Sequence, residues 1–168
     1  MLGNTENYRI TLFLVVSVFI IKYGTLQYAR AVPGGIPGVC NSVARITKLT
    51  DLSFGAMLVD YTGSLVIDTN DGVSTTGGVT RFSGAISTSR FQVTGCPDKA
   101  YTIILPDIVT ISSTTSSMNV DSFISNPVTG LLDPNGKQDI SVGARLNVIT
   151  SQAPGDYSGS FPVEVAFE

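Results

Sequence analysis

The chain has 168 residues, with 10 Lys and Arg against 13 Asp and Glu, no histidine and two cysteines. Its net charge of −3 argues against a nucleic-acid-binding surface or one that binds anionic membranes. The lack of histidine removes the commonest general base and metal ligand, so we expect no enzyme, no cofactor and no metal site.

Residues 1–31 have the layout of a secretory signal peptide. Arg9 precedes an uncharged apolar run of 12 residues, Ile10 to Ile21, and Ala29-Arg30-Ala31 supplies a cleavage site of the A-x-A type. The run is shorter than the roughly 17 to 25 residues that cross a bilayer. We therefore expect export, cleavage after Ala31 and no stable membrane span in the mature chain.

Residues 32–43 form an N-terminal extension that is rich in proline and glycine. Its first part reads Val32-Pro-Gly-Gly-Ile-Pro-Gly-Val39, which is typical of neither a regular strand nor a helix. Val32 and Ile36 nevertheless fall on even positions, with Gly34 and Gly38 between and after them.

The two cysteines, Cys40 and Cys96, are expected to form a disulfide, because an exported chain reaches an oxidising compartment. The bond would close a loop of about 57 residues and contribute about 4 kcal/mol in the chain-entropy model. A metal pair or a reactive thiol is less favoured, since the chain has no histidine and no C-x-x-C spacing.

From Ala44 onward, short runs of period two alternate with turn residues, and no helical period is sustained. The turn signals are Asn70-Asp71-Gly72, Thr76-Gly77-Gly78 and Asp133-Pro134-Asn135-Gly136. The expected strands are Ala44–Thr50, Ser64–Asp68, Val79–Ser83, Arg90–Thr94, Tyr101–Leu105, Val109–Ile111, Met118–Val120, Ile140–Val148 and Tyr157–Phe167. This pattern predicts one all-β domain, residues 44–168, with an immunoglobulin-like antiparallel β-sandwich fold.

Acidic residues in the turns offer the main alternative chemistry. Asp68 and Asp71 could in principle form a carboxylate pair, and Asp133-x-Asn135-Gly-x-x-Asp139 faintly resembles a calcium loop. We favour turn roles for all of them, because Asp accepts hydrogen bonds from nearby backbone and the loop lacks the distal glutamate of an EF-hand.

The C-terminal segment has the clearest alternation in the chain. Tyr157, Phe161, Val163, Val165 and Phe167 fall on odd positions, so we expect them on the buried face of a last strand. Tyr157 follows a Pro-Gly turn, and we expect its ring to point inward and its hydroxyl to bond nearby backbone.

This segment resembles the C-terminal motif of chaperone–usher pilus subunits. Gly155 is the fourteenth residue from the end and Phe167 is penultimate, where those subunits usually have tyrosine. The resemblance extends over residues 44–168 to a bacterial domain family of unknown function, the 4402 type, whose sequences are pilin-like. The motifs that carry it are Leu52-Ser-Phe-Gly55, Phe91-Gln-Val-Thr-Gly95, Leu132-Asp-Pro-Asn-Gly136, Val142-Gly143 and Gly155-Asp-Tyr-Ser-Gly-Ser-Phe161.

The resemblance implies a sandwich that lacks its final strand and accepts one from another protein. Gly155, Tyr157, Phe161, Val163, Val165 and Phe167 would form the acceptor edge. A periplasmic chaperone would fill this edge first, and the extension of a neighbouring subunit would replace it, with Val32 and Ile36 as possible donor side chains.

The expected function is therefore that of a secreted structural subunit of a pilus or fimbria-like fibre, passing through the periplasm to the cell surface. The alternative is a stand-alone secreted sandwich, an adhesin-like binding module that does not polymerise and whose terminal strand is covered by one of its own strands.

Overall fold

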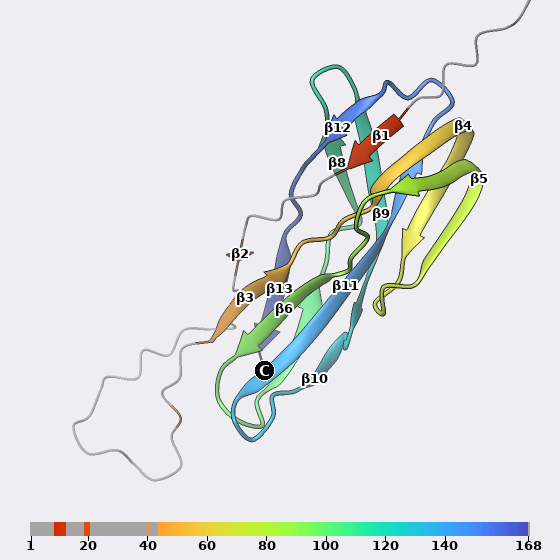
Figure 1. Ribbon diagram of the computed structural model, residues 1–168. Coiled ribbons are helices and arrows are strands. Elements are labelled where there is room, and N and C mark those ends of the chain that lie inside the picture. The colour runs from red at the N-terminus through yellow and green to blue at the C-terminus, as the bar shows by residue number, and fades with distance from the viewer. Residues whose placement is uncertain (1–8, 13–18, 21–39, 41–43, 168) are drawn as a thin grey trace, which may run out of the picture.

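The computed structural model describes residues 9–12, 19–20, 40 and 44–167 (Figure 1). These residues form strands joined by turns and loops, with no helix among them. The prediction of an all-β sandwich is confirmed. Val32 and Ile36 lie outside the described residues, and of residues 9–12 and 19–20 only the backbone is described.

The strands form two sheets, which are antiparallel apart from two pairings that involve β1 and β2. The smaller sheet has the order β10 (Thr129–Leu131), β7 (Ala100–Ile104), β13 (Val163–Phe167) and β2 (Phe19–Ile20). The larger, nine-stranded sheet contains β1 (Arg9–Leu12), β3 (Arg45–Thr50), β4 (Gly55–Ile67), β5 (Val73–Ser83), β6 (Ser89–Thr94), β8 (Ile108–Ser112), β9 (Ser117–Asn126), β11 (Lys137–Val148) and β12 (Gly155–Tyr157).

Strand β11 organises the larger sheet because it is long enough to pair with three strands. Strand β9 lies along one side of it, while β6 and then β4 lie along the other. Strand β5 covers the far side of β4, and β8 covers the far side of β9. The larger sheet is therefore branched and does not form a single row of strands.

The core lies between the sheets and takes residues from both. Its largest buried side chains include Phe54, Phe91, Tyr101, Tyr157 and Phe161, each at most 1% exposed. Phe91 and Val93, which alternate with polar residues in the predicted strand Arg90–Thr94, are both fully buried. The alternating burial along β6 and β11 follows the period of two that the sequence shows.

Some predictions about the strands were wrong. The sequence predicts a turn at Gly77 and Gly78, but both lie inside β5. They are needed there because the strands approach closely: a Cβ on Gly77 would lie 2.2 Å from the carbonyl oxygen of Thr62. The prediction for Ser64–Asp68 also missed the first half of its strand, which begins at Gly55.

The turn roles of Asp68 and Asp133 agree with the structure, while that of Asp71 needs correction. The carboxylate of Asp68 accepts hydrogen bonds from the backbone N–H groups of Asn70 and Gly72, and that of Asp133 accepts them from Asn135 and Lys137. The carboxylate of Asp71 instead bonds Thr88, seventeen residues away. It therefore ties two segments together and does not shape its own turn.

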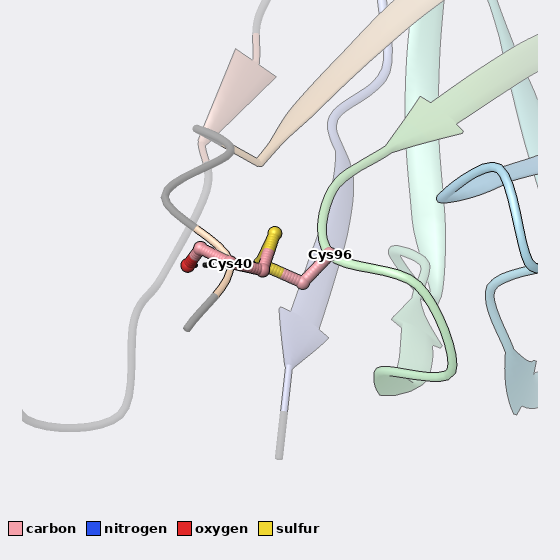
Figure 2. Close-up of a disulfide and its surroundings, with 2 residues drawn as sticks. All are labelled: Cys40 and Cys96. Carbon is pink, nitrogen blue, oxygen red and sulfur yellow. Dashed lines mark hydrogen bonds between the residues drawn. A yellow bond between two sulfur atoms is a disulfide. The ribbon is translucent and has the colours of Figure 1, made fainter. Parts of the chain in front are cut away.

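The predicted disulfide between Cys40 and Cys96 is present (Figure 2). It ties the start of the domain to the turn after β6, and the end of β13 passes close to it. A Cβ on the neighbouring Gly95 would lie 3.7 Å from the ring of Phe167. The disulfide therefore fixes Cys40 at the C-terminal end of β13.

Candidate strand-acceptor site

The C-terminal segment alternates as predicted but does not form one strand. Tyr157, Phe161, Val163 and Val165 are each at most 1% exposed, while Ser158 and Ser160 between them are exposed. The segment divides into β12 in the larger sheet and β13 in the smaller one. Pro162, which has no N–H to donate, lies in the connection between them. The expected single terminal strand therefore crosses from one sheet to the other.

Tyr157 has the structural role that the sequence predicted for it. Its ring is fully buried, and its hydroxyl donates a hydrogen bond to the backbone carbonyl of Ala153. The hydroxyl oxygen of Tyr157 also accepts a hydrogen bond of 2.8 Å from Nε2 of Gln152, whose side chain is buried too. The turn before β12 is therefore held in place by a satisfied polar contact inside the core.

The other side of this segment is fixed to the hairpin of β8 and β9. Ser112 and Ser158 exchange two backbone hydrogen bonds, of 2.9 and 3.0 Å. Nε2 of Gln152 also bonds the Ser116 hydroxyl and the Ser117 carbonyl. Gly159 packs so closely on Ile111 that a Cβ would lie 2.9 Å from its side chain. These contacts hold β12 in place independently of β1.

These pairings close a ring of strands, and β1 is the member that completes it. The ring runs from β4 through β11, β9 and β8, and then across the Ser112–Ser158 contact to β12. Strand β1 lies between β12 and β4 at one end of the molecule (Figure 1). Without β1, the ring would have an opening one strand wide between Gly55–Leu58 and Gly155–Tyr157.

The register of β1 shows how a strand fits this opening. It runs parallel to β12 and antiparallel to β4. Ile10 lies opposite Met57, Leu12 lies opposite Tyr157, and both of those partners are fully buried. Residues that face each other across paired strands point to the same side of a sheet. The apolar residues of β1 therefore occupy register positions on the core face.

Strand β13 presents a second, simpler edge. Strand β7 pairs with it on one side, with Phe167 opposite Tyr101, and their rings lie 6.5 Å apart. On the other side it pairs in parallel with β2, where Phe19 lies opposite the buried Val163. Within the described ranges, β2 is thus paired on one side only, whereas β1 is paired on both.

We call the β4–β12 opening and the side of β13 that pairs with β2 together the acceptor edge. Five of the six residues that were predicted for a strand acceptor lie along it, and Phe161 lies in the connection between β12 and β13. Tyr157, Phe161, Val163 and Val165 contribute buried side chains, and Phe167 is partly buried at the far end. Gly155 has a φ of +153°, which favours glycine, at the start of β12. The contribution of β4 was not predicted, because nothing in the sequence of Gly55–Leu58 distinguishes it from an ordinary strand.

Most groups with a shifted pKa lie away from the acceptor edge. Hydrogen bonds from the Arg145 side chain lower the pKa of Asp121 on β9, and those from Thr88 lower the pKa of Asp71. Beside β13, burial raises the pKa of Tyr101. Its hydroxyl is the single buried side-chain polar atom without a hydrogen-bond partner in the described part of the chain.

No other arrangement of side chains among the described residues suggests chemistry. They contain no group of three potential metal ligands and no helix long and apolar enough to cross a membrane. A polar depression of about 300 Å³ beside β6 and β11 is lined by Gln92, Asp133, Lys137, Gln138 and Asp139. Three of these residues already have hydrogen-bond partners, because the Gln92 amide donates to the Asp139 carboxylate and the Asp133 carboxylate accepts from the backbone of its own turn.

Comparisons with known proteins give one finding. No curated protein and no solved structure matches the chain significantly. The model of the family described as "Domain of unknown function (DUF4402)" matches residues 45–167, which include β3 to β13 and therefore both walls of the β4–β12 opening. Because the match covers most of its length, the chain belongs to the DUF4402 family.

Proposed function

We propose that this protein is a secreted structural subunit of a pilus or fimbria-like surface fibre. It assembles by β-strand complementation, in which a strand from another protein pairs with the acceptor edge. The partners are a periplasmic chaperone and neighbouring subunits. The protein passes through the periplasm to the cell surface.

The observation that carries this proposal is the origin of the strands on the acceptor edge. Both β1 and β2 come from residues 9–20, inside the segment with the layout of a signal peptide. Export with cleavage after Ala31 would remove both strands. The exported domain would then lack the strand that pairs with Met57 and Tyr157, two residues whose side chains are buried.

An exposed edge of this kind has a well-understood use. Unpaired N–H and C=O groups beside an apolar surface are a template for another strand. Main-chain hydrogen bonds then supply affinity, and alternate side chains fill pockets and set the register. The pairing of β1 and β2 over residues 155–157 and 163–164 supports this proposal, because these strands of the same chain already occupy that edge.

The donor role of the N-terminal extension stays a prediction, because Val32 and Ile36 lie outside the described residues. Replacing both with Asp would place charges where a donor strand needs apolar side chains. If the extension acts as a donor, the double variant should no longer join a neighbouring subunit. Unchanged assembly would exclude the donor role and leave the acceptor role intact.

One observation favours the alternative, a stand-alone binding module. The strands that cover the acceptor edge belong to the same chain. If residues 9–20 are retained after export, the sandwich is complete by itself and does not need a partner. The two functions therefore differ in what happens to these residues.

The deciding experiment follows the full-length protein in its native bacterium. N-terminal sequencing of the exported form tests where the chain is cleaved. SDS gels of unboiled surface extracts test whether the subunits form stable complexes. We expect a mature N-terminus near Val32 and SDS-resistant complexes that collapse on boiling. A cleaved protein that stays a stable, soluble monomer would contradict the proposal. An adjacent chaperone and usher gene would support it independently.

A further inference from the structure

We infer that the strand which fills the β4–β12 opening comes from a different protein and not from a copy of this chain. This inference rests on the proposed function, since it concerns the exported form. The partner strand is extended, apolar at alternate positions and free of proline beside Gly55–Leu58.

A strand in the β4–β12 opening has a neighbouring strand on each side. Ile10, Thr11 and Leu12 each have a partner on β12 and another on β4. Successive residues of a strand direct their N–H groups to opposite sides, so a strand between two neighbours uses all of them. A proline at any position therefore removes a hydrogen bond and leaves a carbonyl unpaired beside the core.

The protein's own extension is too short to reach β12 along the terminal segment. After cleavage at Ala31, eight residues precede Cys40, and the disulfide fixes Cys40 near the end of β13. From Phe167 back to Gly155 the terminal segment spans twelve residue steps. Eight extended residues reach about 27 Å, and they are four residue steps fewer than the twelve that separate Phe167 from Gly155. An extension that follows the terminal segment therefore stops short of β12.

The prolines in the extension make the extension of a neighbouring copy a poor fit for the β4–β12 opening. Strand β4 offers four paired positions, Gly55 to Leu58. Pro33 and Pro37 are four residues apart, so every run of four residues between Val32 and Val39 contains a proline. Whichever register the extension takes, it loses a hydrogen bond in the two-sided opening.

The same prolines are compatible with pairing to β13 on the side that β2 occupies. Pro33 and Pro37 have the same parity, so their missing N–H groups fall on one side of an extended strand. A strand paired on one side only, as β2 is, can turn that side to solvent. The prolines thus exclude the extension from the opening and not from every edge. This chain accepts a strand at β4–β12 that its own copies do not supply.

Synthetic peptides test the inference on the exported chain. The probes are residues 9–20 with a lysine tail for solubility, the same peptide with Thr11→Pro, a Thr11→Ala control, and residues 32–44 with Cys40→Ser. Binding is followed by fluorescence anisotropy. The yield of exported chain refolded with each peptide serves as a second measurement, in case the chain alone is unstable.

We expect the 9–20 peptide to bind and to raise the refolding yield, and the Thr11→Ala peptide to bind within about threefold of it. The Thr11→Pro peptide should bind roughly tenfold more weakly or worse, because a hydrogen bond beside the core is lost. The 32–44 peptide should neither bind the opening nor raise the yield. Equal binding of the 32–44 and 9–20 peptides would overturn the inference alone. A stable exported chain that binds neither peptide would overturn the proposed function, and the inference with it.

Discussion

The two strands of the C-terminal segment depend on residues 9–20 to different extents. Strand β13 pairs with β7 over four positions, so it keeps a neighbour when β2 is absent. Strand β12 has β1 as its only extended pairing in the described part of the chain, supported by the Ser112–Ser158 contact and the Gln152 side chain. Loss of residues 9–20 therefore leaves β13 half paired and β12 without a strand partner. The difference shows that one continuous sequence pattern can hold two edges with different requirements.

The largest expected effect comes from breaking the β13 half. Val165 is 1% exposed and lies opposite Ile103 of β7. Val165→Asp would bury an unpaired carboxylate and should lower the free energy of unfolding by roughly 3–5 kcal/mol in urea titrations of the full chain. Glu164→Gln, on the other face, should change it by less than about 0.5 kcal/mol. Equal effects of the two changes would show that β13 does not belong to the core.

A smaller effect is expected from breaking the anchor of the β12 half. Tyr157→Phe keeps the buried ring but removes the hydroxyl that bonds Ala153 and Gln152. The free energy of unfolding should fall by about 1–2 kcal/mol, because the part-buried Ala153 carbonyl loses its donor and the buried Gln152 amide loses an acceptor. Tyr61→Phe is the matched control, since Tyr61 is 58% exposed. A Tyr157→Phe variant as stable as the control would mean that this contact does not hold β12.

Proline substitutions in the 9–20 peptide sharpen the comparison directly. Beside β12 the strand is paired on both sides, so Ile10→Pro and Thr11→Pro should each weaken binding to the exported chain. Beside β13 it is paired on one side, so only one of Phe19→Pro and Ile20→Pro should weaken binding by hydrogen-bond loss. Alanine at each position corrects for the lost side chain. If both prolines beside β13 weaken binding equally, that edge is two-sided as well.

The smallest expected effect is on the pH dependence of stability. It concerns Asp121 on β9, a strand of the ring that lies away from the β4–β12 opening. Asp121 bonds Arg145 and Asn147, and its pKa is lowered chiefly by the Arg145 hydrogen bonds. A carboxyl with a lowered folded pKa adds stability that is present above its unfolded pKa, about 3.9, and is lost as pH falls through the folded value. Asp121→Asn should therefore flatten the loss of stability below about pH 4. Urea midpoints between pH 2 and pH 6 measure this, and an unchanged slope would contradict it.

The sequence predicts much of this fold because its strands are half buried. Phe91 and Val93 alternate with polar neighbours, and both are fully buried in β6. The disulfide followed from the presence of two cysteines in a chain expected to be exported, and the Tyr157 contact followed from its position after a Pro-Gly turn. The pattern fails where spacing between strands decides the structure, as at Gly77 and Gly78, whose position inside β5 depends on the approach of β4.

The candidate site is predictable only on one of its walls. The alternation from Tyr157 to Phe167 indicates the buried face of the terminal segment, but not its division between two sheets. The opposite wall, Gly55–Leu58, comes from pairing with residues far away in the sequence. The bridge between Ser112 and Ser158, which closes the ring of strands, is likewise a contact between distant parts of the sequence, so no local pattern could reveal it.

Hydrogen exchange on the exported chain tests the central claim most directly. Amides of Gly55–Leu58 and Gly155–Tyr157 that face the opening should exchange quickly in the chain alone. They should become protected when the 9–20 peptide is added, while the amides of β11 that pair with β9 stay protected throughout. Full protection of both walls in the exported chain without any peptide would show a sandwich that is already complete. That result would contradict the account of this protein as a strand acceptor.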